Sequence, residues 1–129
     1  RTQSGGMRYV ELTTGAGVTS SPTPMPSAER PNVLPLDGEI DLHVSPRIAA
    51  SLNQMLVAKP KKLVVDLSQV SYIDSSGLAV LIEGMQNVAA YGGKFALAGL
   101  QEGVRPIFEI ARLDQIFEIF PTVEAALAA

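Results

Sequence analysis

Short runs of apolar residues alternate with longer segments of helical periodicity along most of this chain. Four of the runs predict β-strands, at 32–40, 63–67, 95–98 and 116–119. Pro35 marks the first of them as an edge strand or an irregular one. The run at 63–67 is β-branched and apolar with almost no alternation, which is typical of a strand covered on both faces.

Apolar residues recur every three or four positions between these runs. The spacing predicts a helix with Ser45 as N-cap and Pro46 at N1, which Pro60 brings to an end. The longest helix carries its apolar stripe from Leu78 to Ala89, and Gly92-Gly93 closes it.

Two further helices are expected, one at 104–111 and a short alanine-rich one from Thr122. Strands that alternate with helices predict crossover connections and a largely parallel sheet. The length of 129 residues suits one domain. We therefore expect a single α/β domain with a central mixed, mostly parallel sheet of four to five strands, flanked by about four helices.

The first part of the chain has a different composition. Residues 7–12 alternate apolar and polar positions and predict a half-buried strand. Prolines, serines and threonines dominate from 13 to 31, which indicates an extended connection more than a docking segment. We interpret residues 1–6, which are polar and contain no hydrophobic signal region, as a cloning remnant, and 7–129 as the domain.

Composition and charge exclude several classes of function. The net charge of −3 and the absence of a basic stripe argue against direct binding to nucleic acid. There is no cysteine and one histidine, so neither a thiolate site nor a metal site is expected, and no cofactor is predicted. No apolar run is longer than the five residues of 78–82, which is too short to span a bilayer, and we expect a cytoplasmic protein. A phosphate-binding Gly-x-x-x-x-Gly-Lys motif is also missing.

Two loops should meet at the carboxyl edge of the sheet. If the first two strands run parallel, residues 41–45 and 72–77 lie at the same edge, where open α/β sheets place their sites. Asp74, Ser75 and Ser76 then occupy the N-cap and first turn of the long helix, where free N–H groups attract anions. The residues alone leave two interpretations open, a helix cap or an anion site.

A serine hydrolase is a further alternative, with Ser75 as nucleophile and His43 as base. The segment Ile73-Asp74-Ser75-Ser76-Gly77 lacks the first glycine of a nucleophile elbow. The pattern therefore favours a loop histidine over a catalytic base.

Several short sequence segments, in the right order from about 33 to 129, resemble the STAS domain of bacterial anti-sigma-factor antagonists. An Asp-Ser-Ser-Gly-Leu run at a helix start, preceded by Val-Asp-Leu-Ser, carries most of the likeness. The segments are Leu36-Asp37-Gly38-Glu39-Ile40-Asp41, Val64-Val65-Asp66-Leu67-Ser68, Ile73-Asp74-Ser75-Ser76-Gly77-Leu78, Gly93-Lys94-Phe95-Ala96-Leu97-Ala98-Gly99 and Val104-Arg105-Pro106-Ile107-Phe108.

The resemblance implies a binding protein with a phosphorylation switch and no enzymatic activity. In that family the serine after the aspartate is phosphorylated by a kinase that is also the anti-sigma factor, and a phosphatase restores it; Ser75 holds this position. Asp74 and Ser76 match the surrounding motif, and Asp41 matches an acidic residue near the acceptor. In that family a tight turn commonly joins the first strand to the second. The stretch from 13 to 31 departs from this pattern.

The partner-binding residues that we expect lie around the acceptor. They are Asp41, His43, Asp74, Ser75, Ser76 and Gly77. Gly77 is expected to leave the backbone open to close approach. The alternative within the same fold is a STAS subunit of a larger signalling or membrane-transport complex.

Overall fold

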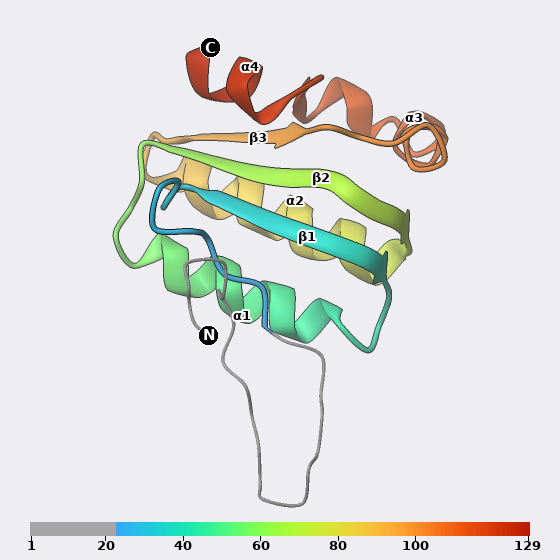
Figure 1. The fold of residues 1–129 in the computed structure, drawn as a ribbon, viewed down its shortest axis with the longest axis horizontal. Helices are drawn as coiled ribbons and strands as arrows, with labels where there is room; N and C mark the ends of the chain where they lie inside the picture. Colours follow the sequence, from blue (N-terminus) through green and yellow to red (C-terminus); the bar gives the residue numbers. More distant parts are fainter. Residues whose placement is uncertain (1–22) are drawn as a thin grey trace, which may run out of the picture.

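Four parallel strands form the sheet in the computed structural model, which describes residues 23–129 (Figure 1). The strands are β1 (Val33–Ile40), β2 (Lys62–Ile73), β3 (Lys94–Ala98) and β4 (Glu118–Phe120), in the spatial order β1-β2-β3-β4. All neighbouring pairs in the described part are parallel. The strand predicted at 7–12, the interpretation of 1–6 and the first part of the predicted loop lie outside the described residues.

Helices cover both faces of this sheet. They are α1 (Ser45–Leu56), α2 (Ser75–Ala90), α3 (Arg105–Ile110), the 3₁₀ helix η1 (Leu113–Gln115) and α4 (Val123–Ala128). α1 and α2 lie together on one face, and α4 lies on the other (Figure 1). The predicted α/β fold is confirmed. None of the helices between residues 23 and 129 is long and apolar enough to cross a membrane.

Alternate residues of β2 face the two helical layers. Leu63, Val65 and Leu67 join the larger core cluster, which includes the inward sides of α1 and α2. Val64 points to the opposite layer, where it packs with residues of β3 and α4. This confirms the prediction that the run at 63–67 is covered on both faces, because all four apolar residues are buried.

β2 extends six residues beyond the predicted end at 67. Its register with β1 shifts twice, between Pro35 and Asp37 and again between Gly38 and Glu39. At each shift β2 holds one residue more than β1, so its buried residues after Leu67 come at intervals of three, at 70 and 73. Regular alternation therefore stops where the prediction ended the strand. Gly38 has a φ of +74° at the second shift, a conformation that favours glycine.

The last strand also differs from its prediction, 118–120 in place of 116–119. Phe117 is buried in an aromatic cluster, with its ring centroid 6.0 Å from that of Phe95 and 6.1 Å from that of Phe108. Its N–H donates to the carbonyl oxygen of Leu113 (2.9 Å), which keeps the chain in the turn after η1. Tertiary packing thus delays the start of β4.

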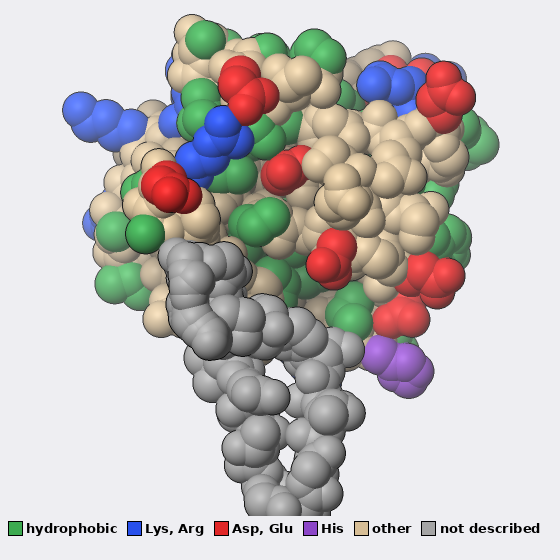
Figure 2. Space-filling model, viewed as in Figure 1, with side chains coloured by type: hydrophobic (Ala, Val, Ile, Leu, Met, Phe, Trp, Pro, Cys, Tyr) green, Lys and Arg blue, Asp and Glu red, His purple; other side chains and the backbone are tan. Residues whose placement is uncertain are grey.

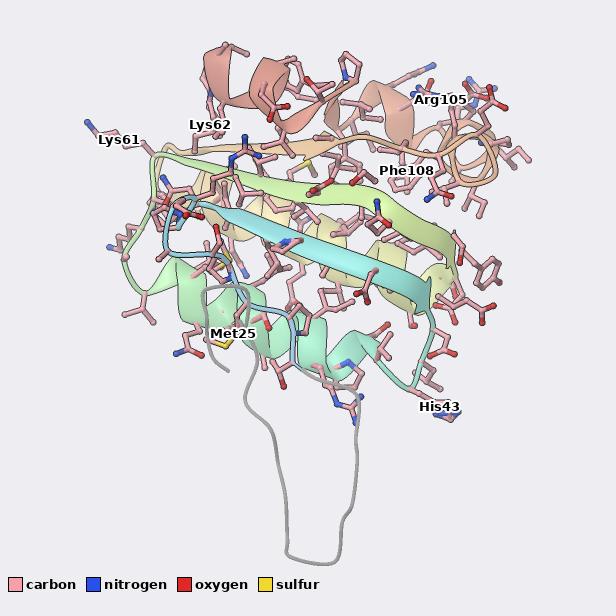
Figure 3. All side chains as sticks on the ribbon, in the orientation of Figure 1. Met25, His43, Lys61, Lys62, Arg105 and Phe108 are labelled. Atoms are coloured by element: carbon pink, nitrogen blue, oxygen red, sulfur yellow. The ribbon has the colours of Figure 1, made fainter. Side chains whose placement is uncertain are left out.

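Residues 23–32 form no helix, and they contact two helices. The Ser51 hydroxyl of α1 donates to the carbonyl oxygen of Pro24 (2.6 Å), and Met25 lies beside the same helix (Figure 3). Arg30 forms an ion pair with Glu124 of α4 (2.6 Å). The described end of the predicted loop is thus held against the domain at two points.

Candidate functional site

The loops that follow β1 and β2 lie side by side at the carboxyl edge of the sheet. The N–H of Asp74 donates to the carbonyl oxygen of Ile40 (2.9 Å), which joins the end of β2 to the end of β1. The first loop, 41–44, leads into α1, and Asp74 leads directly into α2. This is the arrangement that parallel strands predict, and it brings Asp41, Asp74, Ser75 and Ser76 into one region.

Asp74 caps α2. Its Oδ1 accepts hydrogen bonds from the N–H groups of Ser76 (2.9 Å) and Gly77 (3.2 Å) and from the Ser76 hydroxyl (2.6 Å). The hydrogen bond from the Ser76 side chain, helped by the backbone N–H groups and opposed by desolvation, holds the pKa of Asp74 below its ordinary value of 3.8. The first turn of α2 is therefore occupied by a carboxylate at neutral pH.

Hydroxyl groups connect the two loops. The Oγ atoms of Ser45 and Ser76 are 2.7 Å apart, and the Ser45 hydroxyl also reaches the carbonyl oxygen of Asp41 (2.8 Å). The prediction that Ser45 is the N-cap of α1 is wrong, because the cap position is Val44 and no side chain caps that end. Ser45 is the first residue of the helix, and its hydroxyl bonds outside it.

Two hydroxyl protons serve three oxygen contacts in this group. Ser76 donates to the ionised Asp74, because a hydrogen bond to a charged acceptor is the stronger one. The Ser45 proton is then shared between the Asp41 carbonyl oxygen and the Ser76 oxygen. The charge of Asp74 thus sets the direction of the hydrogen bonds up to the β1–α1 loop.

Ser75 and Ser76 differ sharply although they are neighbours. Ser75 is exposed at the first residue of α2, and its hydroxyl has no hydrogen-bond partner among residues 23–129. The hydroxyl of Ser76 is half-buried and bonded to Asp74 and Ser45. Within this motif, Ser75 is the hydroxyl that an incoming protein can reach.

His43 is exposed at the same end of the molecule. Its backbone N–H donates to Oδ1 of Asp41 (2.9 Å), and its ring points away from the domain (Figure 3). Acidic side chains lie beside it on the surface (Figure 2). In the described part of the chain His43 and Ser75 form no hydrogen bond, the contact by which a base activates a serine nucleophile. Between residues 23 and 129, no three metal-ligating side chains gather.

Gly77 does not leave the backbone open to a partner, in contrast to the expectation. It is buried, and a Cβ there would lie 2.7 Å from Cγ2 of Ile40 and 2.7 Å from Cγ1 of Ile73. The glycine lets α2 start close against the ends of β1 and β2. This close packing fixes the first turn of α2, which carries the exposed Ser75.

Two exposed apolar side chains at this edge were not predicted from the sequence. Leu42 of the β1–α1 loop is 70 % exposed, and Tyr72 near the end of β2 is 46 % exposed. The sequence could have indicated that Leu42 is exposed, since it stands between Asp41 and His43 in a loop with no helical or strand periodicity. Tyr72 had no such signal, because its exposure follows from the second register shift, at which it pairs with Glu39.

Comparison with known proteins gives the family. The family model described as the STAS domain matches residues 24–126, and the chain belongs to the STAS domain family. The "Anti-sigma-B factor antagonist" of Listeria monocytogenes is 34% identical over 82 residues, which cover 64% of this chain and 72% of the relative. The "Anti-sigma-F factor antagonist RsfB" of Mycobacterium tuberculosis is 30% identical over 95 residues, covering 74% and 77%.

A solved structure of the same kind agrees with the fold. The anti-sigma factor antagonist SpoIIAA in its unphosphorylated form superposes with a TM-score of 0.65 at 25% identity, covering 74% of this chain and 83% of that one. Within the STAS family, this chain is therefore similar to proteins named as anti-sigma-factor antagonists, and the resemblance stated from the sequence is confirmed.

Proposed function

We propose that this chain is an anti-sigma-factor antagonist that a phosphate on Ser75 switches. The unmodified form binds an anti-sigma factor that is also a serine kinase. Phosphorylation of Ser75 by that kinase releases the complex, and a serine phosphatase restores the free hydroxyl. The chain itself catalyses no reaction in this cycle.

The observation that carries the proposal is the contrast between two adjacent serines. A kinase must bring its own catalytic groups to the acceptor oxygen, which requires an accessible hydroxyl. Ser75 is exposed, whereas the Ser76 oxygen lies in hydrogen bonds with Asp74 and Ser45. The relatives' names support a regulatory role, and the SpoIIAA structure is described as an unphosphorylated form.

Charge explains how a phosphate would act at this position. A phosphoserine adds roughly −1.5 to −2 charge, and a helix N-terminus stabilises an anion by about 0.3–1 kcal/mol, so the fold tolerates the modification. Moving a complex from almost fully bound to almost fully free needs about 5.5 kcal/mol of differential affinity. Most of that difference must arise at the partner surface, where a desolvated dianion would face Asp41 and Asp74 as well as partner groups.

The test is phosphorylation by candidate anti-sigma kinases with ATP, followed by mass-spectrometric mapping. We expect phosphate on Ser75 in the wild type and in Ser76→Ala, and none in Ser75→Ala. Ser75→Ala should still bind the kinase, because the change removes one hydroxyl and adds no charge.

Binding of the phosphorylated chain to the same kinase is measured in parallel by calorimetry. We expect a large loss of affinity relative to the unmodified chain. Phosphate on Ser76 alone, or equal affinity of both forms, would contradict the proposal.

A further inference from the structure

Two buried serines lie on α1, and their hydroxyls have different partners. Ser51 is 6 % exposed and bonds to the carbonyl oxygens of Arg47 (3.1 Å) and Pro24 (2.6 Å), away from the site. Ser45 is 4 % exposed and bonds to the Asp41 carbonyl oxygen and the Ser76 hydroxyl. Only the second of these two serines contacts the turn that carries Ser75.

The contacts of Ser45 complete a continuous path of hydrogen bonds. The path runs from the Asp74 carboxylate to the Ser76 hydroxyl (2.6 Å), on to the Ser45 hydroxyl (2.7 Å), and then to the Asp41 carbonyl oxygen (2.8 Å). One end adjoins Ser75 in the chain, and the other end adjoins the exposed Leu42 and His43. The Ser45 hydroxyl thus adds a side-chain link between the acceptor turn and the β1–α1 loop, beside the contacts that Asp74 itself makes with the backbone of Ile40 and Leu42.

A phosphate on Ser75 would compete with the carboxylate at the start of this path. Phosphate oxygens are strong acceptors, and the N–H groups of Ser76 and Gly77 are already bonded to Asp74. Two anions cannot both take the same donors, and they repel each other at close range. A displaced carboxylate no longer accepts from the Ser76 hydroxyl, whose proton then goes to a phosphate oxygen or to Ser45. Either change alters the hydroxyl to which Ser45 is bonded.

We propose that Ser45 is a positioning residue, which couples the charge at Ser75 to the loop that carries Leu42 and His43. The proposal rests on the proposed function, since it describes how that switch would reach the partner surface beyond the modified residue itself. The change stays local, because the path involves two loops and the first turns of two helices. The amino edge of the sheet is not part of it.

The coupling can be measured without any kinase by incorporating phosphoserine at position 75 during synthesis. Backbone amide chemical shifts of Leu42 and His43 are compared with those of the chain that has serine there. We expect clear shifts in the wild-type background and in Ser51→Ala, the matched buried serine of α1. In Ser45→Ala the shift of His43 should be clearly smaller, whereas Ser45→Thr, which retains the hydroxyl, should keep it. Leu42, whose N–H also interacts with Asp74, should shift in both variants.

The result that would overturn the coupling is an undiminished shift of His43 in Ser45→Ala, or an equal loss in Ser51→Ala. If Ser45→Ala does not fold, Ser76→Ala interrupts the same path from its other side and is judged by the same criterion. The proposed function is tested separately and fails if no candidate kinase phosphorylates Ser75. The chemical shifts do not depend on that result, because the phosphate is introduced during synthesis.

Discussion

The two edges of the sheet differ in what their polar groups do. At the carboxyl edge, Asp74 and two serine hydroxyls hold two loops together and leave Ser75 free beside exposed apolar side chains. All four lysines of the chain lie at or just before the start of β2 or β3, at the amino edge, and they are Lys59, Lys61, Lys62 and Lys94.

One lysine of the amino edge has a clear structural task. The ammonium group of Lys62 donates to the carbonyl oxygens of Ala126 (3.0 Å) and Leu127 (3.4 Å) and to that of Ala129, at the end of α4. Figure 3 shows Lys61 and Lys62 at the end of the sheet opposite to His43. A single cation at one edge thus helps to fix a helix on the sheet, while the other edge presents a hydroxyl to solvent.

The largest expected effect concerns the packing behind Ser75. Gly77→Ala should lower the free energy of unfolding by about 1–3 kcal/mol, because the new methyl group overlaps Ile40 and Ile73. Gly103→Ala is the control, since a Cβ there has no atom within 4 Å. Urea denaturation measures both. Equal stability of the two variants would show that α2 does not need this close approach.

The second prediction compares exposed apolar residues of the two edges. Leu42→Ser should weaken binding to the anti-sigma factor by about 1–2 kcal/mol, or roughly tenfold, because apolar anchors carry much of an interface's energy. Val57→Ser, at the C-terminal end of α1, removes a side chain that is 82 % exposed and should leave the affinity unchanged. Calorimetric titration decides, and a similar loss in both variants would contradict a partner surface confined to the carboxyl edge.

The third prediction concerns the attachment of α4. Lys62→Met should cost about 1 kcal/mol of stability, because it leaves the carbonyl groups at the end of α4 without their cationic donor. The neighbouring Lys61→Met removes the same charge from an exposed side chain and should change stability little. Thermal unfolding and amide hydrogen exchange in α4 measure the difference. Identical exchange in both variants would remove the structural role given to Lys62.

The smallest effect is the dependence of the α2 cap on pH. Since the folded-state pKa of Asp74 is lowered from 3.8, its carboxylate stabilises the fold above that value, and the contribution is lost as pH falls through the folded pKa. Asp74→Asn keeps an acceptor at the cap but does not titrate. The wild type should therefore lose its advantage over the variant on acidification below 3.8. A constant difference across acidic pH would show that the carboxylate's charge is not involved.

Local sequence determined the parts whose cause lies within a few residues. The alternation of apolar runs with helical stripes specified the α/β order, and Asp74 was recognisable as a cap, because the acceptor and the N–H groups it satisfies are at most three residues apart. Ser75 was placed by the same local pattern at the start of the helix, and its role as acceptor is implied by the resemblance of that motif to the STAS domain and stays a proposal.

Only the tertiary structure decided what depends on residues far apart in the chain. The two register shifts that extend β2 and expose Tyr72 arise from pairing with β1, and the close packing at Gly77 needs Ile40 beside it. Ser45 was expected to cap α1 and does not, for the same reason: its hydroxyl bonds to Ser76, 31 residues away. A sequence pattern records which groups need partners, but packing of the sheet and helices chooses which partners they meet.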